Sequence, residues 1–244
     1  LKFNESDLLI LFGLLFLVAF LYFTNVDRLA LLDPDEPRYA ASAREMLETG
    51  NWIVPYFNGQ PRLNKPPLFY WLTALSFKSF GVSEFSARFP SLIFAIAGII
   101  LTFFWARTMW GRLKAFWAGF ILAVNPLYLG VSRLCITDMT MTFFLYLSLY
   151  VFYTGYERGM HSSRQKLSIY ISLAMVFLTK GHVGILIFLL IICSFLLISR
   201  DIKYLTRLWS FKGAIVFAAL TLPWSVMFLA KVGINNVFNL VSHE

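Results

Sequence analysis

The chain has little charge and little cysteine. Only 14% of its 244 residues are Asp, Glu, Lys or Arg, whereas 59% are hydrophobic and 18% are aromatic. Soluble domains contain roughly 25% charged and 45–50% apolar residues, so this composition excludes an ordinary soluble protein and predicts a membrane protein. The two cysteines, Cys135 and Cys193, both fall in apolar runs. Their positions indicate neither a disulfide framework nor a thiolate metal site.

The chain also lacks a continuous basic stretch. Its formal net charge is +8, but the lysines and arginines form short clusters between apolar runs. A protein that binds nucleic acid presents its basic residues together on one face, so we expect no nucleic-acid partner. Short loops rich in Lys and Arg stay in the cytoplasm. The clusters therefore indicate how the chain is oriented in a lipid bilayer.

Apolar stretches suited to membrane helices recur along the chain. A helix needs about 20 mostly apolar residues to cross a bilayer, and seven stretches reach or approach this length. They are Leu8 to Thr24, Ser91 to Met109, Ala115 to Val131, Met139 to Tyr156, Leu167 to Thr179, Val183 to Ser199, and Gly213 to Ala230. We therefore expect an all-α integral membrane protein with several spans.

The basic clusters occupy alternate gaps between these stretches. The clusters are Arg107, Arg112 and Lys114; Arg158, Arg164 and Lys166; and Arg200, Lys203, Arg207 and Lys212. This alternation places the N-terminus in the cytoplasm and residues 25–90 on the outer side of the cytoplasmic (inner) membrane. We expect one transmembrane domain, residues 1–244, in which the outer loop 25–90 carries the site. Because the sequence starts without Met and stops just after an apolar run, we expect the N-terminal part of a longer polypeptide.

The outer loop contains two predicted surface helices. From residue 37 to residue 48 the apolar side chains recur with helical spacing, and Gly50 follows. This pattern is typical of an amphipathic helix that lies on a bilayer. Pro66 and Pro67 exclude a continuing helix but suit the start of a second one over residues 68–80. We expect the two helices to frame a polar pocket.

The stretch D-P-D-E-P-R-Y-A, residues 33–40, concentrates charge just after the first apolar run. One interpretation is a capping box, with Asp33 as N-cap and Glu36 three residues later. Pro37 favours a later helix start, because it has no backbone N–H to donate. The other interpretation is that a carboxylate of this stretch is catalytic. The residues alone leave both interpretations open.

Several motifs together resemble one known family. They are D-E-P-R-Y-A-A-S-A-R-E-M-L-E-T-G-N-W-I-V-P-Y-F-N-G-Q-P-R-L-N-K-P-P-L-F-Y-W from residue 35, R-L-C-I-T-D-M-T-M-T-F-F from residue 133, F-L-T-K-G from residue 177, L-P-W from residue 222, and the terminal H-E. This set resembles the bacterial aminoarabinose transferase and dolichyl-phosphate-mannose protein mannosyltransferase superfamily. Its members are integral membrane glycosyltransferases of the GT-C fold, a multi-span helical bundle. The first motif is highly specific, whereas T-K-G or L-P-W alone is weak.

The resemblance implies a function and a set of site residues. A sugar would pass from an undecaprenyl or dolichyl phosphate carrier to a lipid, glycan or protein acceptor at the outer face. Asp35 would line the active site, and Arg38 and Lys65 would hold the donor phosphate. Elementary chemistry agrees with these roles, because a leaving phosphate needs a bidentate Arg or a Lys point charge, and a hydroxyl acceptor needs a general base. If the acceptor is itself a phosphate, Asp35 would orient it instead.

One departure from the family weakens a metal site. Relatives close to the aminoarabinose transferases carry Glu just before the lysine, and here the residue is Asn64. An amide can hold a sugar hydroxyl but is a poor metal ligand and no base. The departure therefore puts a divalent metal in doubt and shifts the expected reaction away from lipid A modification toward an unspecified relative.

Other polar residues have two interpretations each. Lys180 either reaches toward lipid headgroups or contacts the donor phosphate. Asp138 either forms a salt bridge with Arg133 or Arg88 or supports the site. His243 is either an ordinary surface residue or a group that carries protons. The family resemblance favours Asp138 as a supporting residue of the site. We also expect Glu36, Asn64, Arg133 and His243 to support it.

Two rival functions fit the same composition. A transporter or flippase of a lipid-linked saccharide would show repeated, interrupted spans with a site near the middle of the membrane. A non-catalytic, truncated relative would keep the fold without the chemistry. The densest polar cluster lies in one outer loop, which favours surface chemistry. We therefore expect a glycosyltransferase that acts on a donor held by the lipid bilayer.

Overall fold

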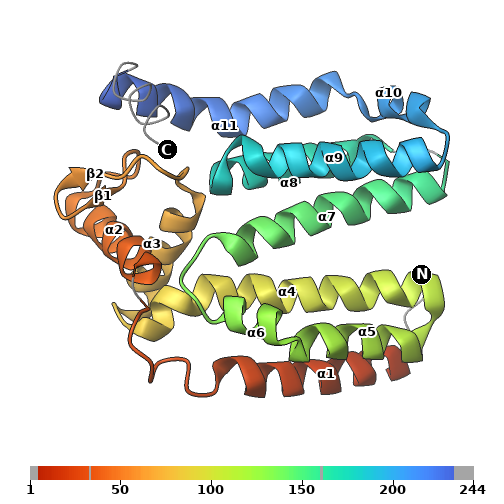
Figure 1. Cartoon of the computed structure of the whole chain (residues 1–244), viewed down its shortest axis with the longest axis horizontal. Coiled ribbons are helices and arrows are strands. Elements are labelled where there is room, and N and C mark those ends of the chain that lie inside the picture. The colour runs from red at the N-terminus through yellow and green to blue at the C-terminus, as the bar shows by residue number, and fades with distance from the viewer. Residues whose placement is uncertain (1–4, 33, 160–161, 234–244) are drawn as a thin grey trace. The chain divides into compact units, whose positions relative to one another are not determined.

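The computed structural model describes residues 5–32, 34–159 and 162–233 of the chain. Its secondary structure is helical apart from one short hairpin (Figure 1). The chain divides into two compact units. Unit 1 comprises Leu1–Arg44 and Leu72–Phe143, and unit 2 comprises Glu45–Trp71 and Phe144–Glu244. Each unit has its own core.

The elements follow one another with short connections. They are α1 (Glu5–Phe23), α2 (Asp35–Thr49), β1 (Tyr56–Phe57), β2 (Gln60–Pro61), α3 (Leu68–Phe80), α4 (Glu84–Trp110), α5 (Arg112–Val124), α6 (Pro126–Ser132), α7 (Asp138–Glu157), α8 (Ser163–Lys180), α9 (His182–Ile198), the 3-10 helix η1 (Ile202–Tyr204), α10 (Leu205–Leu208) and α11 (Phe211–Val232). Six of the seven predicted apolar stretches each coincide with one helix, and the third is divided between α5 and α6. Both predicted surface helices are present, as α2 and α3.

The helices differ in how well each could cross a membrane alone. In the described part of the chain, α4 and α11 are long and apolar enough to do so, and α5 with α6 make a third candidate if the bent pair is one span. The helices Asp7–Phe23 and α9 are apolar but shorter. The predicted all-α membrane class is confirmed. Length and composition alone, however, identify fewer spans among the described residues than the seven that the sequence predicts.

The third predicted stretch is a broken helix. We expected one helix from residue 115 to residue 131, but α5 and α6 meet at 63°. Asn125 between them is extended (φ −61°, ψ 122°), and its side chain accepts the Tyr128 amide at 3.1 Å. The cause is Pro126, since proline pushes the preceding residue out of helical conformation and suits the first position of a new helix.

Unit 1 is built around α1, α4 and α5, which lie side by side (Figure 1). Leu14, Val18, Ile99 and Phe103 are fully buried in their shared core. At one end of the bundle Arg107 Nε donates to Asp7 Oδ1 at 2.9 Å. This ion pair fixes α1 against α4. The sequence did not reveal it, because 100 residues separate the two partners.

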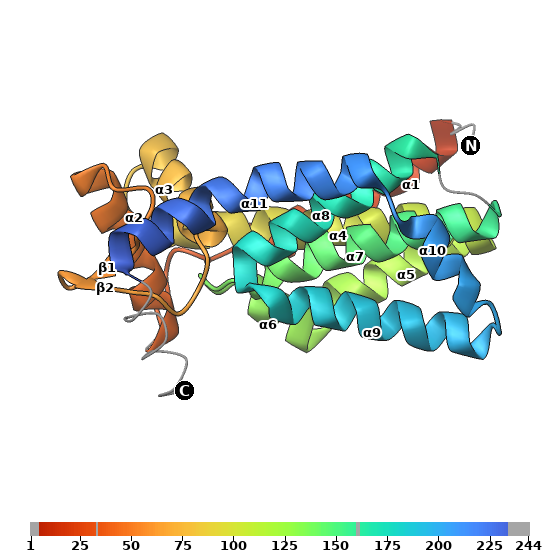
Figure 2. The ribbon, with the colours of Figure 1, turned by 90° about the horizontal axis from the view of Figure 1, so that it is seen from above.

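Unit 2 is built around α8 and α11, which run side by side (Figure 2). Gly213, near the start of α11, permits this approach because a Cβ there would lie only 2.4–2.8 Å from ring atoms of Tyr170. Helix α8 begins four residues earlier than the predicted Leu167, because Ser162 and Gln165 form a capping box. Phe152, α9 and Tyr204 complete the core of this unit.

Gly213→Ala should destabilise unit 2. The added methyl group would overlap the Tyr170 ring, and such overpacking costs about 1–3 kcal/mol. Thermal unfolding of the purified protein in detergent micelles should show a lower midpoint. Gly130→Ala is the matched control, because a Cβ at this helical position has open space within 4 Å. Equal midpoints for the two variants would contradict the close packing of α8 and α11.

Candidate functional site

The first turn of α2 buries a carboxylate. Glu36 is 1% exposed and accepts four hydrogen bonds. Arg88 Nε and the Cys135 amide donate to Oε1 at 2.9 and 2.6 Å, and Arg88 Nη2 and the Leu32 amide donate to Oε2 at 2.9 and 2.8 Å. One side chain thus joins the start of α2, the preceding connection, α4 and the connection from α6 to α7.

Arg88, the ion-pair partner of Glu36, also has all its hydrogen-bond donors paired. Besides the two bonds to Glu36, Arg88 donates to three backbone carbonyls, those of Val26, Leu29 and Ala30, at 2.7–3.0 Å. A guanidinium has five N–H groups, and these bonds use all five. The guanidinium of Arg88 is thus fully hydrogen-bonded to Glu36 and to the chain before α2.

The ion pair sets the charge state of Glu36. Burial by itself would raise the pKa of this carboxyl, but the hydrogen bonds from Arg88, Leu32 and Cys135 and the charge of Arg88 outweigh it and lower the pKa. Glu36 is thus a structural carboxylate that is ionised at neutral pH. The thiol of Cys135 beside it is neutral, because burial and then the charge of Glu36 raise its pKa.

Two charged residues close to Glu36 in the sequence are exposed. Asp35 and Arg38 are both exposed at the start of α2. Residues three apart lie on the same face of a helix, so these two side chains share one face. Pro37 costs the helix no bond, because amides of the first turn have no partner within the helix. The capping interpretation of Asp33 concerns a residue outside the described ranges.

Asn64 and Lys65 belong to a loop of unit 2 that carries a small hairpin. β1 and β2 pair antiparallel, Tyr56 with Pro61 and Phe57 with Gln60. Asn58 and Gly59 between them both have positive φ, 53° and 72°, as the tightest hairpin turn requires. We did not predict this hairpin, although the N-G pair between aromatic and polar residues was its signal.

Two indoles hold the start of this loop. Trp71 Nε1 donates to the carbonyl of Trp52 at 2.7 Å, and Trp224 Nε1 donates to the next carbonyl, of Ile53, at 2.9 Å. Asn51 Oδ1 accepts the amide of Ile53 at 3.2 Å and Lys231 Nζ at 3.2 Å. The tryptophan of the L-P-W motif thus fixes the loop that leads to Lys65, a role that sequence did not reveal.

The remaining candidate residues are distributed over both units. Arg133 follows α6 and donates from Nη2 to the carbonyl of Thr24 at 2.7 Å. Asp138 is the first residue of α7, half-buried, and lies three residues after Cys135, whose amide bonds Glu36. Lys180 is the last residue of α8 and half-buried in unit 2, as Lys65 is. His243 lies outside the described residues.

The donor set for a metal ion is poor in the part of the chain that the structure describes. No three His, Cys, Asp or Glu side chains come together there. Asn64 is exposed, and its amide is a poor metal ligand. These residues do not fit a divalent metal ion.

Comparison with known proteins adds a family and a fold. A family profile described as dolichyl-phosphate-mannose-protein mannosyltransferase matches residues 64–227. The chain is 35% identical over 236 residues to an uncharacterized protein of Aquifex aeolicus, covering 95% of this chain and 52% of that protein. It is 33% identical over 216 residues to the undecaprenyl phosphate-alpha-4-amino-4-deoxy-L-arabinose arabinosyl transferase of Aeromonas salmonicida, covering 87% of this chain and 39% of that protein.

Solved structures agree with these relatives. ArnT from Cupriavidus metallidurans bound to undecaprenyl phosphate superposes with a TM-score of 0.83 at 25% identity, covering 93% of this chain and 42% of ArnT. The S. cerevisiae protein O-mannosyltransferase Pmt1-Pmt2 complex superposes with a TM-score of 0.63 at 19% identity, covering 97% of this chain and 35% of the matched one, which shows a shared fold alone. The chain thus spans about half or less of the length of each relative.

Proposed function

The chain belongs to the dolichyl-phosphate-mannose-protein mannosyltransferase family, and on that premise we propose that the whole protein is a glycosyltransferase that uses a lipid-linked sugar. The protein is an all-α, multi-pass protein of the inner membrane with the GT-C fold. Its donor is a sugar on a polyprenyl phosphate, and its acceptor is a lipid, glycan or protein of the cell envelope. The reaction takes place at the outer side of the membrane.

One observation carries the residue roles. The Glu36–Arg88 pair takes the last carboxylate of the D-P-D-E stretch into the protein and fixes the first turn of α2. Asp35 and Arg38 then remain exposed on one face of a rigid helix start. A site needs reactive groups held by elements whose own geometry is locked, and these two side chains meet that requirement.

The proposed step is a single displacement at the anomeric carbon. An acceptor hydroxyl attacks that carbon, the bond from the carbon to the phosphate oxygen breaks, and the phosphate leaves with the electron pair. Asp35 takes the proton of the attacking hydroxyl, and Arg38, Lys65 and Lys180 bind the leaving phosphate. Inversion at the anomeric carbon follows from one displacement. Glu36, Asn64, Asp138, Arg133 and His243 support the site in this proposal.

The test of the function is a transfer assay with the whole purified protein. Radiolabelled sugars on polyprenyl phosphate are supplied in turn with a membrane extract as acceptor, and the label is followed into lipid, glycan and protein fractions. The expected result is transfer of label from one donor to one fraction. Release of label only into water would point to a hydrolase, and no reaction with any donor would contradict the proposal.

Lys65→Ala should weaken the binding of the donor. A hydrogen bond to a charged group contributes about 1.5–3 kcal/mol, which corresponds to a rise in the KM for the donor of roughly 10- to 150-fold. Steady-state kinetics with varied donor measure this change. Lys78→Ala, at an exposed lysine of α3, is the control that should leave the KM unchanged. An unchanged KM in Lys65→Ala would place that ammonium in the lipid headgroups instead.

A further inference from the structure

Unit 2 contains an apolar cavity that none of the proposed site residues line. It has a volume of about 510 Å³ and lies between α8, α9, α10 and α11. Six of its lining residues show its character: Tyr170, Phe188, Ile192, Leu208, Trp209 and Phe217. Small-molecule sites typically measure about 300–1,000 Å³, so the cavity is large enough for a ligand. Because the lining is mostly apolar, the part of a ligand that enters the cavity should be hydrocarbon.

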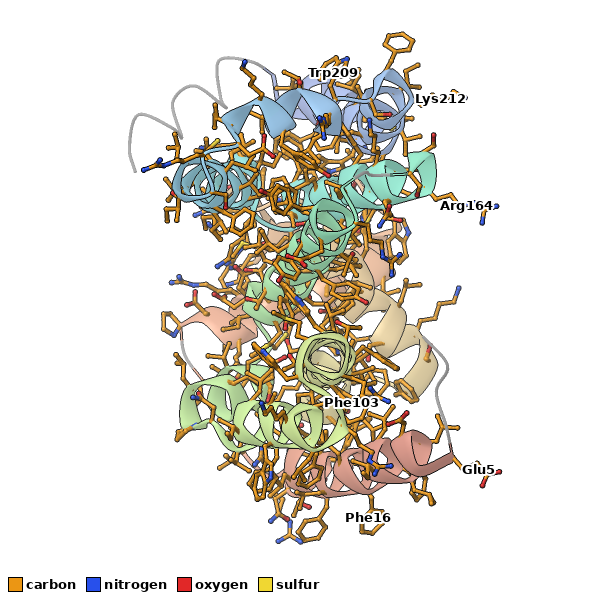
Figure 3. All side chains as sticks on the ribbon, turned by 90° about the vertical axis from the view of Figure 1, so that its right-hand side faces the viewer. Glu5, Phe16, Phe103, Arg164, Trp209 and Lys212 are labelled. Carbon is orange, nitrogen blue, oxygen red and sulfur yellow. The ribbon has the colours of Figure 1, made fainter. Side chains whose placement is uncertain are left out.

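A basic rim lies at one end of this unit. We define the rim as residues 157–159, 162–166 and 199–212, which precede and begin α8 and α11. Together they contain seven lysines and arginines but only two acids, Glu157 and Asp201. The first turns of α8 and α11 contain no acidic residue. Figure 3 looks onto this end and shows Arg164, Trp209 and Lys212 at its surface. The rim thus carries an excess of five positive charges.

Contacts join the rim to the cavity. Trp209 lines the cavity, and its carbonyl accepts Lys166 Nζ at 3.4 Å. The hydroxyl of Tyr170, another lining residue, accepts the amide of Ser210 at 3.3 Å. Lys212 follows three residues after Trp209, in the first turn of α11. The ammonium group of Lys166 is therefore bonded to a residue that lines the cavity, and Lys212 lies close to that residue in the sequence.

The depth of the rim in a bilayer follows from its aromatic residues. Trp209 is 68% exposed and Phe211 is 72% exposed, and tryptophan favours the boundary between hydrocarbon and water. Basic residues beside these side chains then lie at the level of the lipid headgroups. Basic clusters at that level attract anionic lipids.

We propose that the cavity holds an acyl chain of an acidic phospholipid, and that Lys166 and Lys212 bind its phosphate. The charge excess selects this occupant, because a zwitterionic phospholipid brings its own cation to the rim and a neutral lipid brings no anion. The site is independent of the proposed sugar transfer, since it uses none of the residues that carry that reaction. Its ligand is a structural lipid.

Lipid retention on the whole protein tests this assignment. The protein is purified in detergent, reconstituted with an equal mixture of phosphatidylglycerol and phosphatidylcholine, and its retained lipids are counted by native mass spectrometry. We expect one retained phosphatidylglycerol in the wild type. Lys166→Gln with Lys212→Gln should reduce the preference for phosphatidylglycerol by about thirtyfold, since each cation near a membrane surface contributes about fivefold.

Two further variants make the outcome decisive. Lys78→Gln with Lys114→Gln removes two exposed lysines outside the rim and should leave the preference unchanged. Ala214→Leu adds three carbons to a residue that lines the cavity and should lower retention of both lipids with all charges in place. Equal retention of the two lipids in the wild type, or an unchanged preference in the rim variant, would overturn the proposal. Displacement of the retained lipid by polyprenyl phosphate would assign the cavity to the donor instead.

Discussion

Asp35→Asn should lower kcat by about 10²- to 10⁴-fold, the range that a general base typically contributes. The amide has nearly the shape of the carboxylate but cannot take a proton from an acceptor hydroxyl. The substitution also removes a negative charge from the start of α2, which costs the helix only about 0.3–1 kcal/mol. Activity should therefore fall far more than stability does. Initial rates of label transfer and thermal unfolding in the same detergent measure the two effects.

The control for this variant is Asp27→Asn, an exposed carboxylate in the connection before α2. It removes the same charge from the same loop, residues 25–90, and should retain wild-type rates. Full activity of Asp35→Asn would remove Asp35 from the chemistry. A loss of the same size in Asp27→Asn would mean that the reaction responds to the overall charge of the loop.

Among the variants predicted here, Arg88→Ala should cause the largest loss of stability. Removing one partner of a buried ion pair costs about 3–5 kcal/mol, because the other charge remains buried and uncompensated. Here Glu36 would keep only the two backbone amides of Leu32 and Cys135. Thermal unfolding should show a markedly lower midpoint, and the double variant Glu36→Gln with Arg88→Met should recover part of the loss. A double variant that is less stable by the sum of both single losses would contradict coupling of the pair.

The same pair predicts an acid dependence. The pKa of Glu36 is lower in the folded protein than its unfolded value of 4.5. Its contribution to stability is therefore fully present above pH 4.5 and is lost as the pH falls through the folded pKa. The unfolding midpoint of the wild type should decrease over this acidic range. Glu36→Gln should lose this component of the acid dependence, and an unchanged pH profile in that variant would assign it to other carboxylates.

The sequence predicted the elements well and their cross-contacts poorly. Apolar length located the seven stretches, and Pro66-Pro67 located the start of α3, because both signals are local. The bend between α5 and α6 was also encoded locally, by Pro126, but the apolar run continues across it and concealed the break.

The contacts that organise the candidate site are distant in the sequence. Glu36 and Arg88 are 52 residues apart, and Ile53 and Trp224 are 171 residues apart. Neither pair has a spacing that a helix or hairpin would impose, so periodicity could not find them. The family resemblance marked the motifs that contain Glu36, Ile53 and Trp224, but Arg88 lies outside them. The geometry then separated Glu36, which is buried, from Asp35 and Arg38, which are exposed.

The two indoles that hold successive carbonyls of the loop between α2 and α3 also set an order of assembly during synthesis. Trp71 is available as soon as the loop has been made, whereas Trp224 leaves the ribosome 171 residues after Ile53. At about 5–20 residues per second this interval is roughly ten to thirty seconds. While α7, α8 and α9 are being made, the loop that leads to Lys65 can thus form the hydrogen bond from Trp71 but not the one from Trp224. The second hydrogen bond can form only after α11 has been translated. The loop therefore cannot reach its final conformation before the last described helix has been made.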